Sequence, residues 1–159
     1  MIRVNIGGTF YEVPEPGESP NWGREATDTI VALADVLNTL FTDGDILTTR
    51  YTININASVY ENVNGLLFNS NQVTSAIVTY SVNRSVTGTM ITEYGGLYLN
   101  YKEDAPLGEK WALSRVIYSG DAGIIFQCTD LGQVIYSTTD LAGLDYSGEI
   151  IFSAKVVPE

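Results

Sequence analysis

The 159-residue sequence contains no histidine and a single cysteine, Cys128. Without histidine, a Ser-His-Asp triad, a Cys-His dyad and histidine-ligated zinc are all excluded. A lone cysteine cannot form an internal disulfide, so the sequence lacks the cross-links typical of small secreted proteins. Cys128 alternates with Ile124 and Phe126, and this spacing predicts a buried structural thiol.

Basic residues are also scarce: 8 lysines and arginines stand against 19 acidic residues, a formal net charge of −11. Affinity for DNA or RNA depends on Lys and Arg neutralising phosphates, so we expect no nucleic-acid partner. An anionic membrane surface is disfavoured for the same reason, and no stretch approaches the ~18 apolar residues of a membrane span. The N-terminus lacks the basic-then-apolar order of a signal peptide. The sequence predicts a protein made in a cytoplasm and kept there, or assembled into a larger structure from there.

The sequence is rich in residues that favour β-strands. Apolar and polar residues alternate from Ala76 to Asn83 and again from Leu97 to Lys102, the period of a strand with one solvent-exposed face. About eight such segments follow Tyr51, the first of them expected at Thr52–Val59. Their spacing predicts a mainly β fold, an antiparallel, jelly-roll-like β-sandwich over residues 51–159.

The N-terminal part is expected to form a separate unit, residues 1–45. A hairpin is predicted over Ile2–Val13, turning at Gly7-Gly8, and the proline-rich residues 14–20 follow as a connector. An amphipathic helix is predicted over Trp22–Phe41, because apolar residues recur at spacings of four, three, four and three. These residues are Ala26, Ile30, Leu33, Leu37 and Leu40.

Further apolar positions widen the helix surface beyond one stripe, which favours a docking or oligomerisation role. The alternative is a helix buried within its own core. On the docking hypothesis, the expected partner-binding residues are Trp22, Ile30, Leu33, Leu37 and Phe41.

Few polar residues form a pattern that suggests chemistry. Asp43-Gly44-Asp45 lacks the remaining ligands of a calcium loop and predicts a turn that ends the helix. The acidic residues Asp140, Asp145 and Glu149 could pair as in glycosidases, but an acidic chain offers such pairs by chance. We interpret two strand arginines, Arg84 and Arg115, as edge charges or partners for carboxylates. We therefore predict a protein that is not an enzyme, with no catalytic, cofactor-binding or metal-binding residues.

The sequence contains ten tyrosines. Tyr98 lies on the polar face of its predicted strand, and Tyr94 and Tyr118 are expected in or beside turns. A tyrosine offers a large contact area with a hydrogen-bonding tip, which suits interfaces and sugars. These three residues are candidate glycan contacts, the alternative being ordinary tyrosines at the ends of a sandwich.

Taken together, these segments resemble a group of small virion structural proteins of tailed bacteriophages. SPNWGREATDTIVALADVLNTL, preceded by the hairpin, resembles their N-terminal unit, in which Trp22-Gly23 begins an amphipathic helix. SAIVTYSVNRS, GLYLNYK, WALSR, GDAGIIFQCTDLGQVIYSTTDLAG and YSGEIIFSAKVV resemble the β domain that often follows it. The resemblance covers most of the chain. It implies a virion protein made in the bacterial cytoplasm, often trimeric, that attaches to major capsid or tail proteins.

Two functions follow as hypotheses. The first is a structural component of a bacteriophage particle, a head decoration protein or a short head or tail fibre that stabilises the virion. The second is a carbohydrate-binding sandwich that acts in adhesion to a host surface through Tyr94, Tyr98 or Tyr118.

Overall fold

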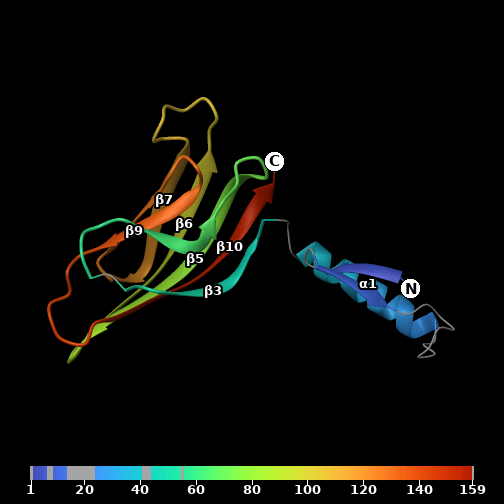
Figure 1. Ribbon diagram of the computed structural model, residues 1–159, viewed down its shortest axis with the longest axis horizontal. Helices are drawn as coiled ribbons and strands as arrows, with labels where there is room; N and C mark the ends of the chain where they lie inside the picture. Colours follow the sequence, from blue (N-terminus) through green and yellow to red (C-terminus); the bar gives the residue numbers. More distant parts are fainter. Residues whose placement is uncertain (1, 7–8, 14–23, 41–43, 55, 159) are drawn as a thin grey trace. The chain divides into compact units, whose positions relative to one another are not determined.

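The computed structural model describes residues 2–6, 9–13, 24–40, 44–54 and 56–158. Internal contacts divide the chain into two compact units, residues 1–43 and residues 44–159. Figure 1 shows a helix-and-hairpin unit and a β-rich unit.

Where the structure describes it, the N-terminal unit is one hairpin and one helix. Strands β1 (Ile2–Ile6) and β2 (Thr9–Val13) pair antiparallel, and α1 spans Arg24–Leu40. Val4 of β1 and Ala34 of α1 are buried against each other, with Ile2, Ile30 and Val31 packed around them. The predicted hairpin and helix are confirmed. The Gly7-Gly8 turn and the proline-rich connector lie outside the described residues.

The described residues of the C-terminal unit form eight strands in two antiparallel sheets, which confirms the predicted β-sandwich. One sheet has the order β3-β10-β5-β6-β7 and the other the order β4-β9-β8. The long strands β5, β6 and β10 run side by side in Figure 1. The strand bounds are β3 Ile46–Thr52, β4 Glu61–Leu67, β5 Val73–Val86, β6 Thr89–Tyr101, β7 Trp111–Gly120, β8 Ile124–Cys128, β9 Gln133–Thr138 and β10 Ser147–Pro158.

The core of the sandwich lies between the two sheets. Val78, Tyr80 and Val82 of β5 point inward, as the alternating pattern requires, and pack with side chains from the three-stranded sheet. The ring centroids of Tyr80 and of Phe126 on β8 are 5.0 Å apart, and the two rings meet edge to face. Contacts of this kind join the two sheets through apolar surface.

The first predicted strand of the sandwich is wrong in position. The strand expected at Thr52–Val59 is found earlier, as β3, and it ends at Thr52. Ile53 is buried, and its amide donates to the Gly148 carbonyl at 2.8 Å, whereas Val59 is 54% exposed. The apolar residues that suggested a strand here therefore do not share one buried face.

Candidate functional site

The outward face of β6 carries two of the predicted glycan-contact residues. Tyr94 and Tyr98 are 47% and 40% exposed, and Gly96 lies between them on the same face. On the neighbouring strand β5, Ser81 lies opposite Tyr94, Thr79 lies opposite Gly96, and Ile77 lies opposite Tyr98. Because strand side chains alternate between faces, these groups form one continuous outer surface.

The third residue, Tyr118, reaches this surface through a bulge in β7. Gly95 pairs with Ile117 but Tyr94 pairs with Ser119, so Tyr118 is the extra residue of the bulge. Its ring lies over Gly96. A β-carbon built at Gly96 would be 3.0 Å from the Tyr118 hydroxyl oxygen and 3.6 Å from two ring carbons. The missing side chain of Gly96 thus leaves the space that the Tyr118 ring occupies.

Tyr94, Tyr98 and Tyr118 together form what we call the tyrosine platform. The hydroxyl oxygens of Tyr98 and Tyr118 are 3.0 Å apart, and the ring centroids of Tyr94 and Tyr118 are 5.4 Å apart at an interplanar angle of 43°. The hydrogen bond with Tyr98 raises the pKa of Tyr118. The platform is an exposed, uncharged cluster of aromatic rings that carries hydroxyl groups.

The structure places the three tyrosines together, although the sequence had suggested different surroundings for two of them. Tyr94 and Tyr118 were expected in or beside turns, and both lie within strands. Tyr98 lies on the polar face of its strand, as expected. Contact with a glycan stays a prediction.

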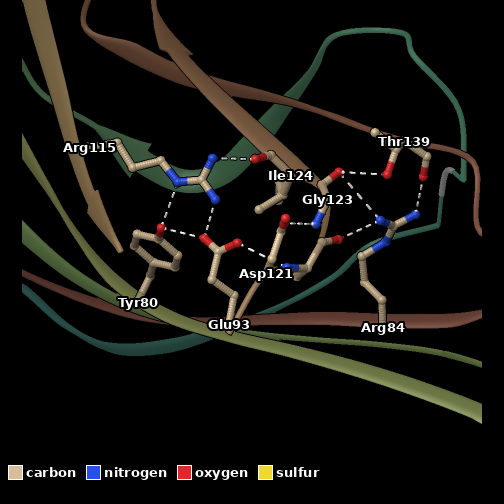
Figure 2. A network of polar contacts seen from close by, with 9 residues as sticks. Tyr80, Arg84, Glu93, Arg115, Asp121, Gly123, Ile124 and Thr139 are labelled. Carbon is tan, nitrogen blue, oxygen red and sulfur yellow. Dashed lines mark hydrogen bonds and ion pairs between the residues drawn. The ribbon is translucent and has the colours of Figure 1, made fainter. Parts of the chain in front are cut away.

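Beneath this region, three polar side chains, two of them buried and the third, Arg115, partly exposed, form a cluster between the sheets (Figure 2). Glu93 of β6 is 2% exposed and forms an ion pair with Arg115 of β7. Its carboxylate also accepts a hydrogen bond of 2.6 Å from the Tyr80 hydroxyl and one of 3.0 Å from the Ala122 amide. Arg115 also donates to the Tyr80 hydroxyl at 2.9 Å and to the Ile124 carbonyl. Burial and the bond to Glu93 raise the pKa of Tyr80 to about 12. The cluster holds β5, β6, β7 and β8 to one another.

A second buried cation, Arg84 of β5, ties together the connections at the same end of the sandwich. It is fully buried and donates to the hydroxyl of Tyr146, the side-chain oxygen of Asn56, and the carbonyls of Ala122, Gly123 and Thr139. Four of these distances lie between 2.6 and 3.1 Å, and the bond to Gly123 is 3.4 Å. All five N–H groups of the guanidinium are therefore used. Figure 2 shows Arg84 directed at Gly123 and Thr139.

The interpretation of Arg84 as an edge charge is wrong, whereas for Arg115, on the edge strand β7, the alternative of a carboxylate partner is confirmed. Both arginines point into the sandwich (Figure 2), and Arg84 donates to five neutral acceptors. Arg115 does pair with a carboxylate, that of Glu93, but inside the protein. A buried charge is stable only when its hydrogen bonds are satisfied, and these contacts satisfy that condition. We assign both arginines a structural role.

The predicted partner-binding residues divide into two groups in the structure. Ile30 is half-buried against the hairpin, whereas Leu33 and Leu37 are 57% and 37% exposed. They therefore do not form the single stripe that the spacing suggested: Ile30 faces the hairpin, and the two leucines form part of an exposed apolar surface. Trp22 and Phe41 lie outside the described residues. A partner for this surface stays a prediction.

The remaining acidic candidates each have a separate partner. The carboxylate of Asp140 accepts from Asn56, Asp145 accepts from Thr87, and Glu149 pairs with Arg50 at 2.9 Å. Within the described ranges, no group of three or more acidic or cysteine side chains is placed to hold a metal ion. The helix that the structure describes in these ranges lacks the length and hydropathy needed to cross a membrane. The structure thus offers these carboxylates no shared site.

The β6–β7 loop borders an open depression of about 880 Å³, lined by residues from Lys102 to Leu113. The Asp130 carboxylate fastens this loop by accepting hydrogen bonds from the Gly108 amide at 2.6 Å and the Lys110 amide at 3.1 Å. These two backbone donors hold the pKa of Asp130 below its ordinary value. The contacts fix the loop against the β8–β9 turn.

Comparison with known proteins gives little guidance on function. No family model matches the sequence, and no curated protein is detectably similar to it. Among solved structures, the chain is similar to the tailspike protein of Acinetobacter baumannii phage AM24, with a TM-score of 0.41 and 4% identity over 72% of this chain. It is also similar to the tailspike of Acinetobacter phage vB_ApiP_P1, with a TM-score of 0.36 and 4% identity over 71%. The matched regions span only 26% and 21% of those tailspikes, and likeness at this level assigns neither a fold family nor a function.

Proposed function

We propose that this protein is a non-catalytic sugar-binding module. The observation that supports the proposal is the tyrosine platform: Tyr94, Tyr98 and Tyr118 are gathered on one exposed sheet face, around a glycine that makes room for one of the rings. Each of the three tyrosines is at least 40% exposed.

The platform has the two properties that sugar recognition requires. Its aromatic faces offer apolar area to the C–H face of a pyranose ring, and its phenol hydroxyls exchange hydrogen bonds with sugar hydroxyls. The rings are also held in place, because the hydrogen bond between Tyr98 and Tyr118 joins two of them and the β7 bulge fixes the position of Tyr118. A rigid site loses little side-chain entropy on binding.

The test is binding of the full chain to an array of bacterial surface glycans, followed by titration calorimetry on each hit. We expect Tyr98→Ala to weaken binding at least about tenfold, or 1.4 kcal/mol. Tyr60→Ala is the matched control, since Tyr60 is 46% exposed but lies outside the platform. Absence of any saturable binding by the folded wild-type chain would refute the proposal.

A second function, a structural component of a bacteriophage particle, is favoured by α1. Leu33 and Leu37 expose apolar surface on a unit whose described residues bury only Val4 and Ala34 as a hydrophobic core. A unit of this size usually needs a further source of stability, and oligomerisation is one such source. We propose that this surface joins copies of the chain, as a homotrimer, or attaches them to capsid or tail proteins. The protein would then be a capsid decoration or a short head or tail fibre that carries the sugar-binding sandwich.

Substitution on the helix tests this second function. Leu33→Asp should abolish oligomers in light-scattering measurements and remove the protein from purified particles analysed by mass spectrometry. Asp35→Asn, an exposed change on the same helix, is the control and should leave both unchanged. A monomeric wild-type chain, together with normal particle attachment of Leu33→Asp, would refute the docking role.

A further inference from the structure

We infer that the tyrosine platform takes an uncharged oligosaccharide chain that lies along β6, rather than an acidic polysaccharide or a single sugar. This inference rests on the sugar-binding function proposed above and specifies its ligand. Three features of the described residues support it: the length of the platform, the chemistry of its rim and the positions of the nearest charges.

The platform is longer than one ring. Tyr94 and Tyr98 are four residues apart on β6, which separates them by about 13 Å at ~3.3 Å per residue, and Tyr118 lies between them over Gly96. Aromatic contacts repeated in the direction of β6, two from β6 and one from β7, match a ligand whose rings repeat along a chain. A single monosaccharide can cover only part of this surface.

The rim of the platform offers neutral hydrogen-bonding groups. Thr79 and Ser81 lie opposite Gly96 and Tyr94 on β5, and Ser114 lies opposite Tyr98 on β7. Their hydroxyls can donate to and accept from sugar hydroxyls. In β5, β6 and β7, all of whose residues are described, every outward-facing position is uncharged, because Arg84, Glu93 and Arg115 point inward.

Cations that could pair with a sugar carboxylate lie at the margins of this face. Lys155, two strands away from Tyr98, is paired with Asp45 at 2.6 Å. Lys102 follows the last residue of β6, four residues beyond Tyr98, and is next to the acidic residues Glu103 and Asp104. The net charge of −11 adds a general repulsion of polyanions. An acidic chain would therefore lose hydration at its carboxylates without gaining an ion pair.

The experiment is affinity electrophoresis of the full chain through gels containing neutral polysaccharides (dextran, mannan, unsubstituted glucans) or acidic ones (hyaluronate, alginate). Gels run at about 20 mM and about 500 mM NaCl vary the Debye length from roughly 20 to 4 Å. We expect neutral polymers to retard the protein equally, within about twofold, at both salt concentrations, because the contacts are uncharged. Acidic polymers should not retard it. Free oligosaccharides should displace the neutral polymer at least about tenfold better than the monosaccharide at equal ring concentration, a difference of 1.4 kcal/mol.

Two variants sharpen the result. Ser114→Lys places a cation beside Tyr98 and should create retardation by acidic polymers that disappears at high salt. Gly96→Ala retains all three tyrosines but displaces the Tyr118 ring, and should weaken neutral binding; circular dichroism and thermal unfolding verify that each variant folds. Salt-sensitive binding of acidic polymers by the wild-type chain would overturn the inference while leaving the sugar-binding function intact. Equal competition by the monosaccharide would overturn the extended site, and absence of binding to every polymer would overturn both proposals.

Discussion

Replacing Arg84 with lysine should destabilise the sandwich strongly even though the charge is kept. The guanidinium uses five N–H donors on five different acceptors, and a lysine ammonium offers three. At least two of the five hydrogen bonds to the charged group would therefore be lost, at about 1–3 kcal/mol each. The expected loss is about 2–6 kcal/mol, a large part of the 5–15 kcal/mol typical of a folded domain.

The assay is urea unfolding followed by circular dichroism, with the free energy of unfolding obtained by linear extrapolation. Arg50→Lys is the matched control, because Arg50 is an exposed arginine whose surface pair with Glu149 contributes no more than about 1 kcal/mol. If Arg84→Lys lowered the stability no more than Arg50→Lys does, the role given to the five-donor contact would be wrong. Equal m-values in the two variants would show that the comparison concerns the folded state.

Two further predictions concern single titratable groups. Backbone donors hold the pKa of Asp130 below its unfolded value near 3.9, so its contribution to stability is present above about pH 4 and is lost as the pH falls below that value. Between pH 5 and about pH 2, the melting temperature of Asp130→Ala should therefore fall less than that of the wild type. Parallel curves of melting temperature against pH for the two proteins would contradict this prediction. Burial raises the pKa of Cys128 to about 12, so at pH 8 the native thiolate fraction should be roughly a thousandfold below that of a free thiol. Labelling by iodoacetamide should be correspondingly slow until urea unfolds the chain, and fast labelling of the native protein would refute it.

The strands of the sandwich could be predicted because most of them bury one face. β5 buries Ala76, Val78, Tyr80 and Val82 in strict alternation, and this is the pattern from which it was predicted. The prediction for the segment after β3 failed because Ile53 joins the core outside a regular strand, where its amide donates to the Gly148 carbonyl. A local apolar pattern does not distinguish these two situations, since the contact that buries Ile53 comes from far along the chain.

The inward orientation of the two strand arginines could have been predicted from the alternation of their strands. Arg84 has the same parity as the buried residues of β5, and Arg115 has that of Trp111 on β7, so strand alternation alone places both arginines inside. Charged residues are almost never fully buried without partners, and this expectation led to the prediction that both arginines lie at the surface. The partners of Arg84 are mainly backbone carbonyls in distant loops, which no sequence pattern identifies.

Gly95 and Gly96 connect the buried cluster with the exposed platform. On the inner face, a β-carbon at Gly95 would lie 2.5 Å from the Tyr80 hydroxyl oxygen and 2.6 Å from the Val116 carbonyl oxygen; on the outer face, Gly96 accommodates the ring of Tyr118. The bulge lies opposite Tyr94 and Gly95, and its extra residue, Tyr118, is three residues from Arg115 along β7. Because Arg115 is bound to Glu93 and Tyr80, the path of β7 at this point is fixed from inside the sandwich. The Glu93–Arg115 ion pair therefore helps to set the position of Tyr118, the most exposed of the three platform tyrosines.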